Sequence, residues 1–222
     1  MKKLSVLLFF LIAASEFNTS YAQVIIGGPY RRGYGRVYRQ RQRPVQPVQQ
    51  LPKFEPTVNI SIGYGFPNLD KNELPLLYNY YRGTYSQNGP VTGSIDYQFS
   101  RNMSIGALVT HGDVSVPYYD YNNAQALKGS LKNWSFMLNI MRYMPVYTTK
   151  VTPYLRTAIG INSWEENFTD AQGNKVNTGI NPSDLAYQIG LGAKFNLSKN
   201  AGFFLEAGYG KYILHGGLTV KF

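Results

Sequence analysis

Hydrophobic and polar positions alternate along most of the chain from Thr57 to Phe222. The first such run places Val58, Ile60 and Ile62 between polar or small residues, and it continues to Phe66. A period of two predicts a β-strand with one apolar face. Between 185 and 197 the alternation continues without a break, over more residues than the usual 5 to 6 of a strand in a soluble protein. The segment therefore favours long strands that cross a thick apolar layer.

Eight such segments are predicted, and the connections between them alternate in length. The predicted strands are 57–66, 90–99, 103–111, 133–146, 151–163, 185–197, 202–210 and 212–222. Short connections occur at 100–102, 147–150 and 198–201, and long ones at 67–89, 112–132 and 164–184. Short turns at one end and long loops at the other are typical of transmembrane barrels of the outer membrane. We therefore predict an all-β fold, an eight-stranded antiparallel transmembrane barrel over 57–222, with both termini periplasmic.

The second face of these strands carries mainly Asn, Ser, Thr, Gly, Gln and Lys. A soluble sandwich or lipocalin-like barrel would turn its apolar face inward, and the second face is too polar to form a dry core. The apolar face is therefore expected to contact lipid. Outward aromatic residues are expected to form two girdles at the membrane interfaces. They are Tyr64, Phe66, Trp134, Tyr187, Tyr209 and Tyr212 at the long-loop end, and Tyr97, Phe99, Phe195, Phe203 and Phe222 at the short-turn end.

Composition narrows the class of protein further. Only 15% of the 222 residues are charged, and the mean hydropathy of -0.26 excludes a helical membrane protein. Since the chain has no Cys, it has no disulfide scaffold, no Cys-ligated zinc or iron-sulfur site and no lipidated N-terminal Cys. The two His residues are far apart and make a poor metal site, so we expect neither metal nor cofactor.

The first 22 residues have the features of a secretory signal peptide. Lys2 and Lys3 precede the apolar run 4–14, and small residues at Ser20 and Ala22 suit cleavage after Ala22. The run is too short for a spanning helix, which needs roughly 20 apolar residues. Removing residues 1–22 lowers the formal net charge from +10 to +9.

Most of that positive charge lies in residues 23–56, a segment rich in Arg, Gln and Pro. We predict a disordered periplasmic tail here, because the segment has little to bury in a core. In an exported chain a nucleic-acid partner is not expected. Attraction to peptidoglycan, to lipid phosphate or to another envelope protein is one interpretation, and a solvated tether is the alternative. The basic residues are Arg31, Arg32, Arg36, Arg39, Arg41 and Arg43.

The last two predicted strands resemble those of the small OmpA/OmpX-type barrels of Gram-negative outer membranes. The terminal run HGGLTVKF looks like the signal read by the barrel assembly machinery, with Gly217, outward Val220 and terminal Phe222. The run FFLEAGYG at 203–210 is similar to a penultimate strand of such barrels. This resemblance implies outer-membrane lipid and lipopolysaccharide as surroundings. It does not select a function, since the family includes anchors, adhesins, narrow pores and a few enzymes.

Strand parity places a set of charged residues inside the predicted barrel. In the simplest register of the sixth and seventh strands, Lys194 lies opposite Glu206 and could pair with it. Such pairs could form a gate that passes small solutes, but a static network that satisfies buried charges is favoured. The interior set is Asp96, Arg156, Lys194, Glu206 and His215, with Lys221 near the end.

The sequence favours a structural or interaction role in the envelope, without enzymatic activity. A narrow channel is the first alternative. A lipid-modifying enzyme is the second, and for it His111, near Thr110 and Asp113, is the candidate base, although a girdle position for His111 is favoured. Clustered Tyr residues in the first two long loops would contact outside partners or pack across extended hairpins. They are Tyr78, Tyr80, Tyr81, Tyr85, Tyr118, Tyr119 and Tyr121.

Overall fold

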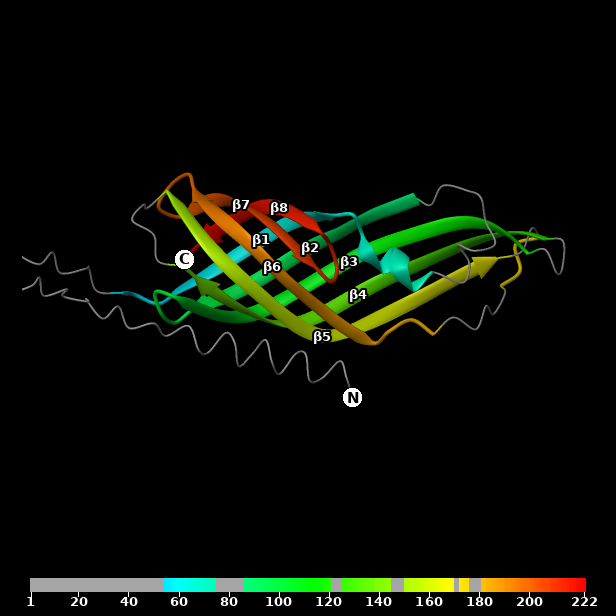
Figure 1. Ribbon diagram of the computed structural model, residues 1–222, viewed down its shortest axis with the longest axis horizontal. Coiled ribbons are helices and arrows are strands. Elements are labelled where there is room, and N and C mark those ends of the chain that lie inside the picture. Colours follow the sequence, from blue (N-terminus) through cyan, green and yellow to red (C-terminus); the bar gives the residue numbers. More distant parts are fainter. Residues whose placement is uncertain (1–53, 75–85, 121–124, 145–149, 170–171, 176–180) are drawn as a thin grey trace, which may run out of the picture. The chain divides into compact units, whose positions relative to one another are not determined.

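A computed structural model describes residues 54–74, 86–120, 125–144, 150–169, 172–175 and 181–222. Its strands form one closed barrel in which each strand pairs with its sequence neighbours, and β1 pairs with β8 (Figure 1). The elements are β1 (Thr57–Phe66), the 3-10 helix η1 (Leu69–Glu73), β2 (Ser86–Gln98), β3 (Met103–Asp120), β4 (Gln125–Tyr143), β5 (Val151–Thr169), β6 (Leu185–Asn196), β7 (Ala201–Tyr209) and β8 (Leu214–Lys221). The predicted eight-stranded antiparallel barrel is confirmed.

The seam between β1 and β8 closes the barrel completely. Ile62 lies opposite Leu218 on one side and Gly93 of β2 on the other. At the end of the seam, Val58 and Phe222 exchange backbone hydrogen bonds of 3.1 and 2.8 Å. Closure leaves no row of unpaired backbone groups facing the hydrocarbon, where each such group would cost several kcal/mol.

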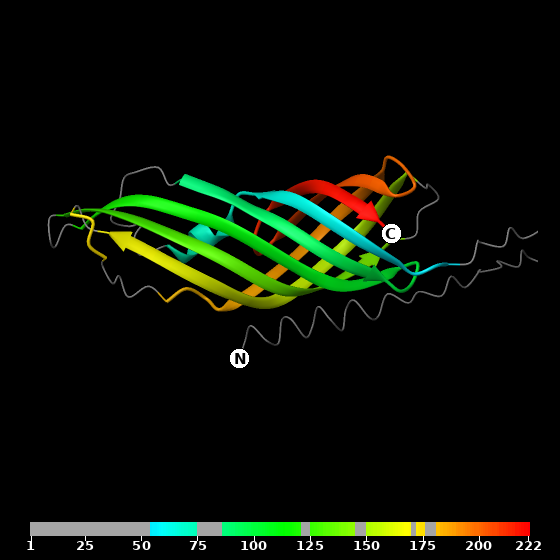
Figure 2. The same ribbon diagram turned by 180° about the vertical axis from the view of Figure 1, so that it is seen from behind.

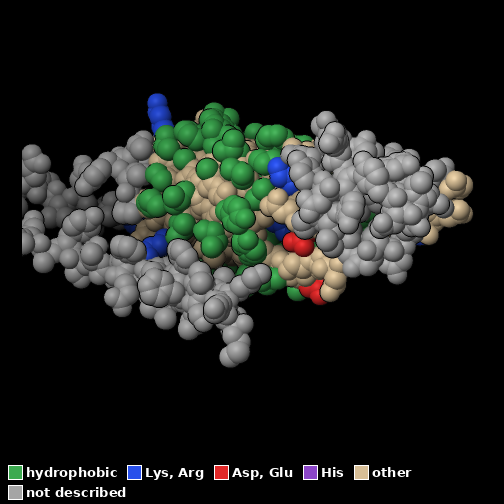
Figure 3. Space-filling view, turned by 45° about the vertical axis from the view of Figure 1, so that its right-hand side comes forward, with side chains coloured by type: hydrophobic (Ala, Val, Ile, Leu, Met, Phe, Trp, Pro, Cys, Tyr) green, Lys and Arg blue, Asp and Glu red, His purple; other side chains and the backbone are tan. Residues whose placement is uncertain are grey.

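The outer surface of the barrel is an apolar belt, which identifies the part of the fold that spans the membrane (Figure 3). Over 60% of the surface of Ile62 and of Leu218 is exposed. In a soluble barrel, positions as exposed as these would carry polar side chains. No helix in the described residues is long and apolar enough to cross a bilayer. Large exposed members of the belt include Val58, Ile60, Ile62, Val91, Ile95, Ile105, Phe136, Leu138, Ile161, Leu191, Leu205, Leu214, Leu218 and Val220.

Most of the aromatic residues predicted to face outward are exposed in the structure, with one error. Tyr212 is fully buried rather than outward. The strand alternation does not include Tyr212, because β8 begins at Leu214 and residues 210–213 form the turn from β7. Gly210 takes a φ of +139° in this turn, and Gln188 Oε1 accepts hydrogen bonds from the backbone of Lys211 and Tyr212, so the ring turns inward.

Three strands run well past the membrane belt at the long-loop end. The predicted strands 103–111, 133–146 and 151–163 were too short there, since β3 continues to Asp120, β4 starts at Gln125 and β5 continues to Thr169 (Figure 2). Hairpin pairing persists beyond the bilayer, where alternation of apolar residues is no longer required. Tyr118 and Tyr119 therefore lie within β3 rather than in a loop.

Several predicted features lie outside the described residues. These are the signal peptide at 1–22, nearly all of the basic tail at 23–56 with its six Arg residues, and Tyr78, Tyr80, Tyr81, Tyr85 and Tyr121.

Candidate functional site

The centre of the barrel is filled by an ion pair between β5 and β7. Arg156 Nε lies 3.1 Å from Glu206 Oε2, and both side chains are almost completely excluded from solvent. Two phenols complete the coordination of the carboxylate: Tyr154 donates to Oε2 and Tyr212 donates to Oε1, each at 3.1 Å. The Glu206 carboxylate is thus satisfied by one cation and two hydroxyl donors, which is how a buried charge is stabilised.

Lys194 does not pair with Glu206, and the predicted register was wrong. In the structure Gly192 lies opposite Glu206 and Lys194 lies opposite Phe204. The hairpin turns about Lys199, because the backbone N–H groups of Leu197 and Ser198 both donate to the carbonyl of Ala201. Lys194 Nζ instead donates to the hydroxyl of Tyr143 at 3.1 Å, with its ammonium 5.2 Å from the centroid of that ring.

The other predicted interior residues belong to smaller groups. Asp96 accepts from Ser94 Oγ at 3.0 Å and from the amide nitrogen of Asn139. His215 Nε2 lies 2.6 Å from Thr92 Oγ1, and the imidazole packs 4.4 Å from the ring of Tyr212. Lys221, in contrast, is exposed at the end of β8.

Glycines opposite these groups provide the space that the large side chains fill. A Cβ at Gly190 would lie 2.6 Å from Glu206 Oε1, and one at Gly192 would lie 2.5 Å from Tyr154 Cζ. A Cβ at Gly63 would come within 2.5 Å of His215 Nε2. Inward Gly therefore alternates with large inward residues around the lumen, which is how a small barrel accommodates bulky side chains.

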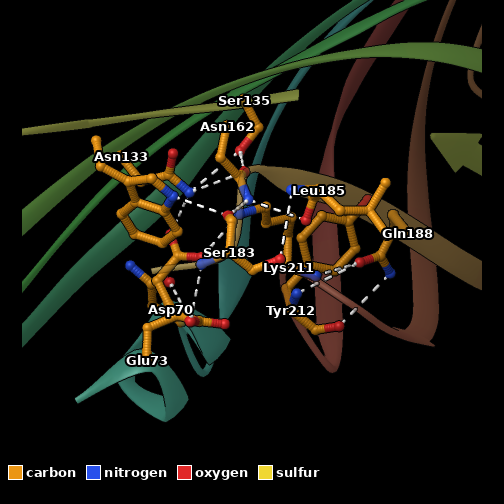
Figure 4. Close-up of polar contacts among 12 residues, drawn as sticks. Asp70, Glu73, Asn133, Ser135, Asn162, Ser183, Leu185, Gln188, Lys211 and Tyr212 are labelled. Atoms are coloured by element: carbon orange, nitrogen blue, oxygen red, sulfur yellow. Dashed lines mark hydrogen bonds and ion pairs between the residues drawn. The ribbon is translucent and has the colours of Figure 1, made fainter. Parts of the chain in front are cut away.

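The mouth of the barrel at the long-loop end is capped by η1, which follows β1. Its residues Leu69 and Asp70 are buried, as is Leu74 after it. Asp70 forms an ion pair of 2.8 Å with Lys211 from the β7–β8 turn (Figure 4). The Leu69 backbone donates to the Lys211 carbonyl at 3.0 Å. We call this pair of charges the latch. It joins the first loop to the last one across the mouth.

Side chains from the opposite wall hold the same cap. Asn133 Nδ2 of β4 donates to Asp70 Oδ2 at 3.0 Å and also contacts Asn162 of β5. Glu73 accepts from the backbone of Ser183 at 3.1 Å, and Trp164 donates to the Ser183 carbonyl at 2.9 Å. Figure 4 shows these contacts converging from β4, β5 and the residues before β6. The cap is therefore tied to the barrel wall on two sides.

Burial lowers the pKa of Lys211 below its ordinary value, and the Asp70 carboxylate opposes that shift. The latch was not predicted from the sequence. Asp70 and Lys211 lie in connections at opposite ends of the strand order, and nothing local relates them. The sequence contains only a weak signal for this contact. Asp70 is an acidic residue in a long loop, and Lys211 is a basic residue in a turn next to an apolar strand.

Removing the latch charge should loosen the cap without changing its shape. Asp70→Asn removes the carboxylate that is paired with the buried Lys211 ammonium, and breaking such a pair typically costs about 3 to 5 kcal/mol. We expect backbone hydrogen exchange across 69–74 to accelerate by at least about tenfold, measured on the protein in lipid. Asn72→Ala, at an exposed position of the same helix, is the control and should exchange like the wild type. Equal protection in Asp70→Asn would contradict a role for the ion pair.

His111 lies opposite Trp134 of β4 near the long-loop end of the barrel, and its place in a girdle stays a prediction. Its ring stacks on Trp134 with centroids 4.2 Å apart, and Nδ1 donates to the Asn133 carbonyl at 3.0 Å. Thr110 is buried on the lumen side, so strand parity separates its hydroxyl from the imidazole. The structure thus does not bring His111 together with the nucleophile that the enzyme alternative needs. Within the described ranges, no group of three or more His, Cys, Asp or Glu side chains could hold a metal ion.

Some buried polar atoms have no hydrogen-bond partner among the described residues. They are spread over several heights of the lumen, from the short-turn end to the mouth. The set includes Asn59 Nδ2, Asn139 Oδ1, Arg156 Nη1, His215 Nδ1 and Asn133 Oδ1. An unsatisfied buried group is costly, so these atoms are places where single water molecules could bind inside the lumen.

Comparison with known proteins finds similar chains among solved structures. No protein-family profile and no curated protein matches the chain. Among solved structures, a de novo designed transmembrane β-barrel is 16% identical, with a TM-score of 0.41 over 75% of this chain and 95% of that one. The N-terminal barrel domain of Pseudomonas aeruginosa OprF is 13% identical, with a TM-score of 0.37 over 75% and 97%. Yersinia pestis Ail, solved with a heparin analogue, is 14% identical, with a TM-score of 0.39 over 75% and 97%.

Proposed function

We propose that this chain is an outer-membrane protein that acts as a structural and interaction element of the envelope, with both termini in the periplasm. It would contact outside partners through the extended β3–β4–β5 hairpins and the Tyr-rich loops. One observation carries the proposal: these three strands continue past the apolar belt as a paired sheet. At roughly 3.3 Å per residue, β3 alone continues for about 30 Å along its own axis beyond His111.

The filled lumen supports a role for the outer surface instead of transport. The Arg156–Glu206 pair occupies the centre of the barrel, and the latch closes the outer mouth. A barrel of eight strands has an interior just wide enough for its own side chains. Partners would therefore meet the outer surface of the protein, and the hairpins are the part of that surface farthest from the membrane.

Photo-crosslinking from single positions on intact cells tests the interaction role. Tyr118 and Tyr119 are neighbouring positions of β3, and successive positions of a strand belong to opposite faces of its sheet. A photoreactive amino acid at one of them should capture a protein partner, and the neighbouring position should capture much less. Ile62, in the apolar belt, is the control and should capture lipid only. Absence of any adduct at 118, 119 and the loop Tyr positions would contradict the proposal.

The basic tail adds a proposed contact on the periplasmic side. Of the net charge of +9 that remains after removal of residues 1–22, +6 belongs to residues 23–56, which directly precede β1. Long-range attraction of this kind favours anionic partners such as peptidoglycan. If the tail anchors the barrel, deleting 23–56 should abolish co-sedimentation with peptidoglycan.

A narrow channel is the second candidate, and the unpartnered lumen atoms favour it. Conduction would require η1 to leave the mouth, so Asp70→Asn should show a larger ion current than the wild type in planar bilayers. Glu206→Gln should change that current further, because it removes the central charge. If the wild type, Asp70→Asn and Glu206→Gln all give no ion current, the channel function is eliminated.

A further inference from the structure

Basic side chains surround the end of the barrel where the short turns lie. Among the described residues, the solvent-accessible charged side chains at this end are five cations and the carboxylate of Glu55. At the opposite end the described residues include several acids, among them Asp113, Glu165 and Asp184. In the view of Figure 3, blue side chains lie at the left edge of the apolar belt, whereas both blue and red side chains lie at its right edge. We call the five cations the basic rim: Arg101, Arg142, Lys150, Lys199 and Lys221.

Backbone contacts place three of these cations on adjoining strand ends. The backbone of Asn196 at the end of β6 donates to the Lys150 carbonyl at 2.8 Å, and β6 leads directly into the turn that carries Lys199. In that turn the Asn200 carbonyl accepts from the Lys221 backbone at 2.7 Å. Lys150, Lys199 and Lys221 therefore follow one another along the perimeter, and all three are exposed.

The two arginines extend the rim on the other side of the barrel. Arg142, near the end of β4, lies opposite Met103 of β3, and Arg101 is in the turn just before Met103. The Tyr143 backbone donates to the Asn102 carbonyl at 2.7 Å, which holds the β2–β3 turn against β4. The rim thus has positive charge on both sides of the barrel.

The height of the rim is set by the aromatic girdle next to it. Phe99 is two residues from Arg101, and Phe222 is adjacent to Lys221. Phe195 and Phe203 stack at 4.6 Å between the β6 and β7 ends that flank Lys199. Aromatic rings of this kind lie at the boundary between acyl chains and headgroups. The cations beyond them are therefore at the depth of lipid phosphates.

We infer that the basic rim binds the phosphates of anionic phospholipids in the leaflet at the short-turn end. Cations spread singly around a perimeter match separate headgroups in a plane, whereas a rigid anionic polymer would engage one compact patch. Basic groups next to a membrane are attracted to anionic lipid, and the attraction falls off within a Debye length. This site is separate from the hairpins, so it does not depend on the proposed interaction role.

The test uses the full chain refolded into phosphatidylcholine nanodiscs with and without phosphatidylglycerol. After gentle release, native mass spectrometry counts the phospholipids that stay bound. The variant Lys150→Gln, Lys199→Gln, Lys221→Gln should reduce phosphatidylglycerol affinity by about tenfold or more, since each cation near an anionic surface contributes roughly fivefold. Phosphatidylcholine binding should not change. The matched control replaces Lys71, Lys132 and Lys175 at the other end of the barrel by Gln and should bind phosphatidylglycerol like the wild type.

Each other outcome counts against the inference. Equal losses in the two triple variants would mean that net charge, not the rim, holds the lipid. A loss on deleting 23–56 together with wild-type binding in the rim variant would assign the lipid to the tail. Reduced peptidoglycan co-sedimentation with unchanged phosphatidylglycerol binding would identify a polymer as the partner. Folding is checked by the mobility of unheated samples on gels, and Arg101→Gln with Arg142→Gln replaces the triple variant if that variant does not fold.

Discussion

Gly217→Val should prevent the barrel from closing. A Cβ at this position of β8 would lie 2.0 Å from the Ile62 carbonyl oxygen and 2.5 Å from Gly63 Cα, both of them backbone atoms of β1. Backbone in a hydrogen-bonded seam cannot move aside without loss of the pairing, so the cost should exceed about 4 kcal/mol. We expect almost no heat-modifiable folded protein after refolding into lipid vesicles.

Gly93→Val is the matched control. Gly93 lies on the other side of β1, opposite Ile62, and a Cβ there would meet no atom within 4 Å. This variant should fold to the wild-type yield. Refolding in vitro omits the assembly machinery, so it separates the steric effect from the role expected for Gly217, Val220 and Phe222 in the assembly signal. If Gly217→Val refolds as completely as Gly93→Val, the close approach at the seam is not what requires glycine.

Arg156→Ala should be the most damaging substitution in the lumen. It leaves the Glu206 carboxylate buried with the Tyr154 and Tyr212 hydroxyls as its remaining donors. Removing one partner of a buried pair typically costs about 3 to 5 kcal/mol. Urea unfolding in vesicles, followed by the fluorescence of Trp134 and Trp164, measures the free energy of unfolding.

An apolar replacement of the whole pair separates charge from packing. Arg156→Met combined with Glu206→Leu removes both charges and retains most of the volume, so it should recover most of the lost stability. The two phenols would then lose their acceptor, which limits the recovery. A single Arg156→Ala variant within about 1 kcal/mol of the wild type would show that the phenols alone satisfy the carboxylate.

The strand pattern predicted the barrel because the lipid imposes it. Each crossing must put an apolar side chain outward at every second position, and the runs around Ile62 and Leu191 do so without exception. Beyond the belt that constraint ends. The continuation of β3 to Asp120 depends on cross-strand pairing with β4, which a single strand does not reveal.

The interior was predictable as a set of residues, but its contacts were not. The alternation of positions along each strand indicated which residues face inward. The β6–β7 turn, however, is shifted by one residue, so Glu206 lies opposite Gly192 and not opposite Lys194. The partner of Glu206 is Arg156, from a strand that is not its neighbour. The latch is still less local, because Asp70 and Lys211 meet only once all strands have closed.

The unequal lengths of the strands give the molecule a tall side and a low side. Beyond the membrane, β3, β4 and β5 stand as a wall, whereas β7 and β8 end at the turn that holds Lys211. A large macromolecule could thus reach the strand wall from many directions, but the wall would screen the mouth from one flank. Access to the cap would be directional, and a binder raised against η1 should approach over β7 and β8.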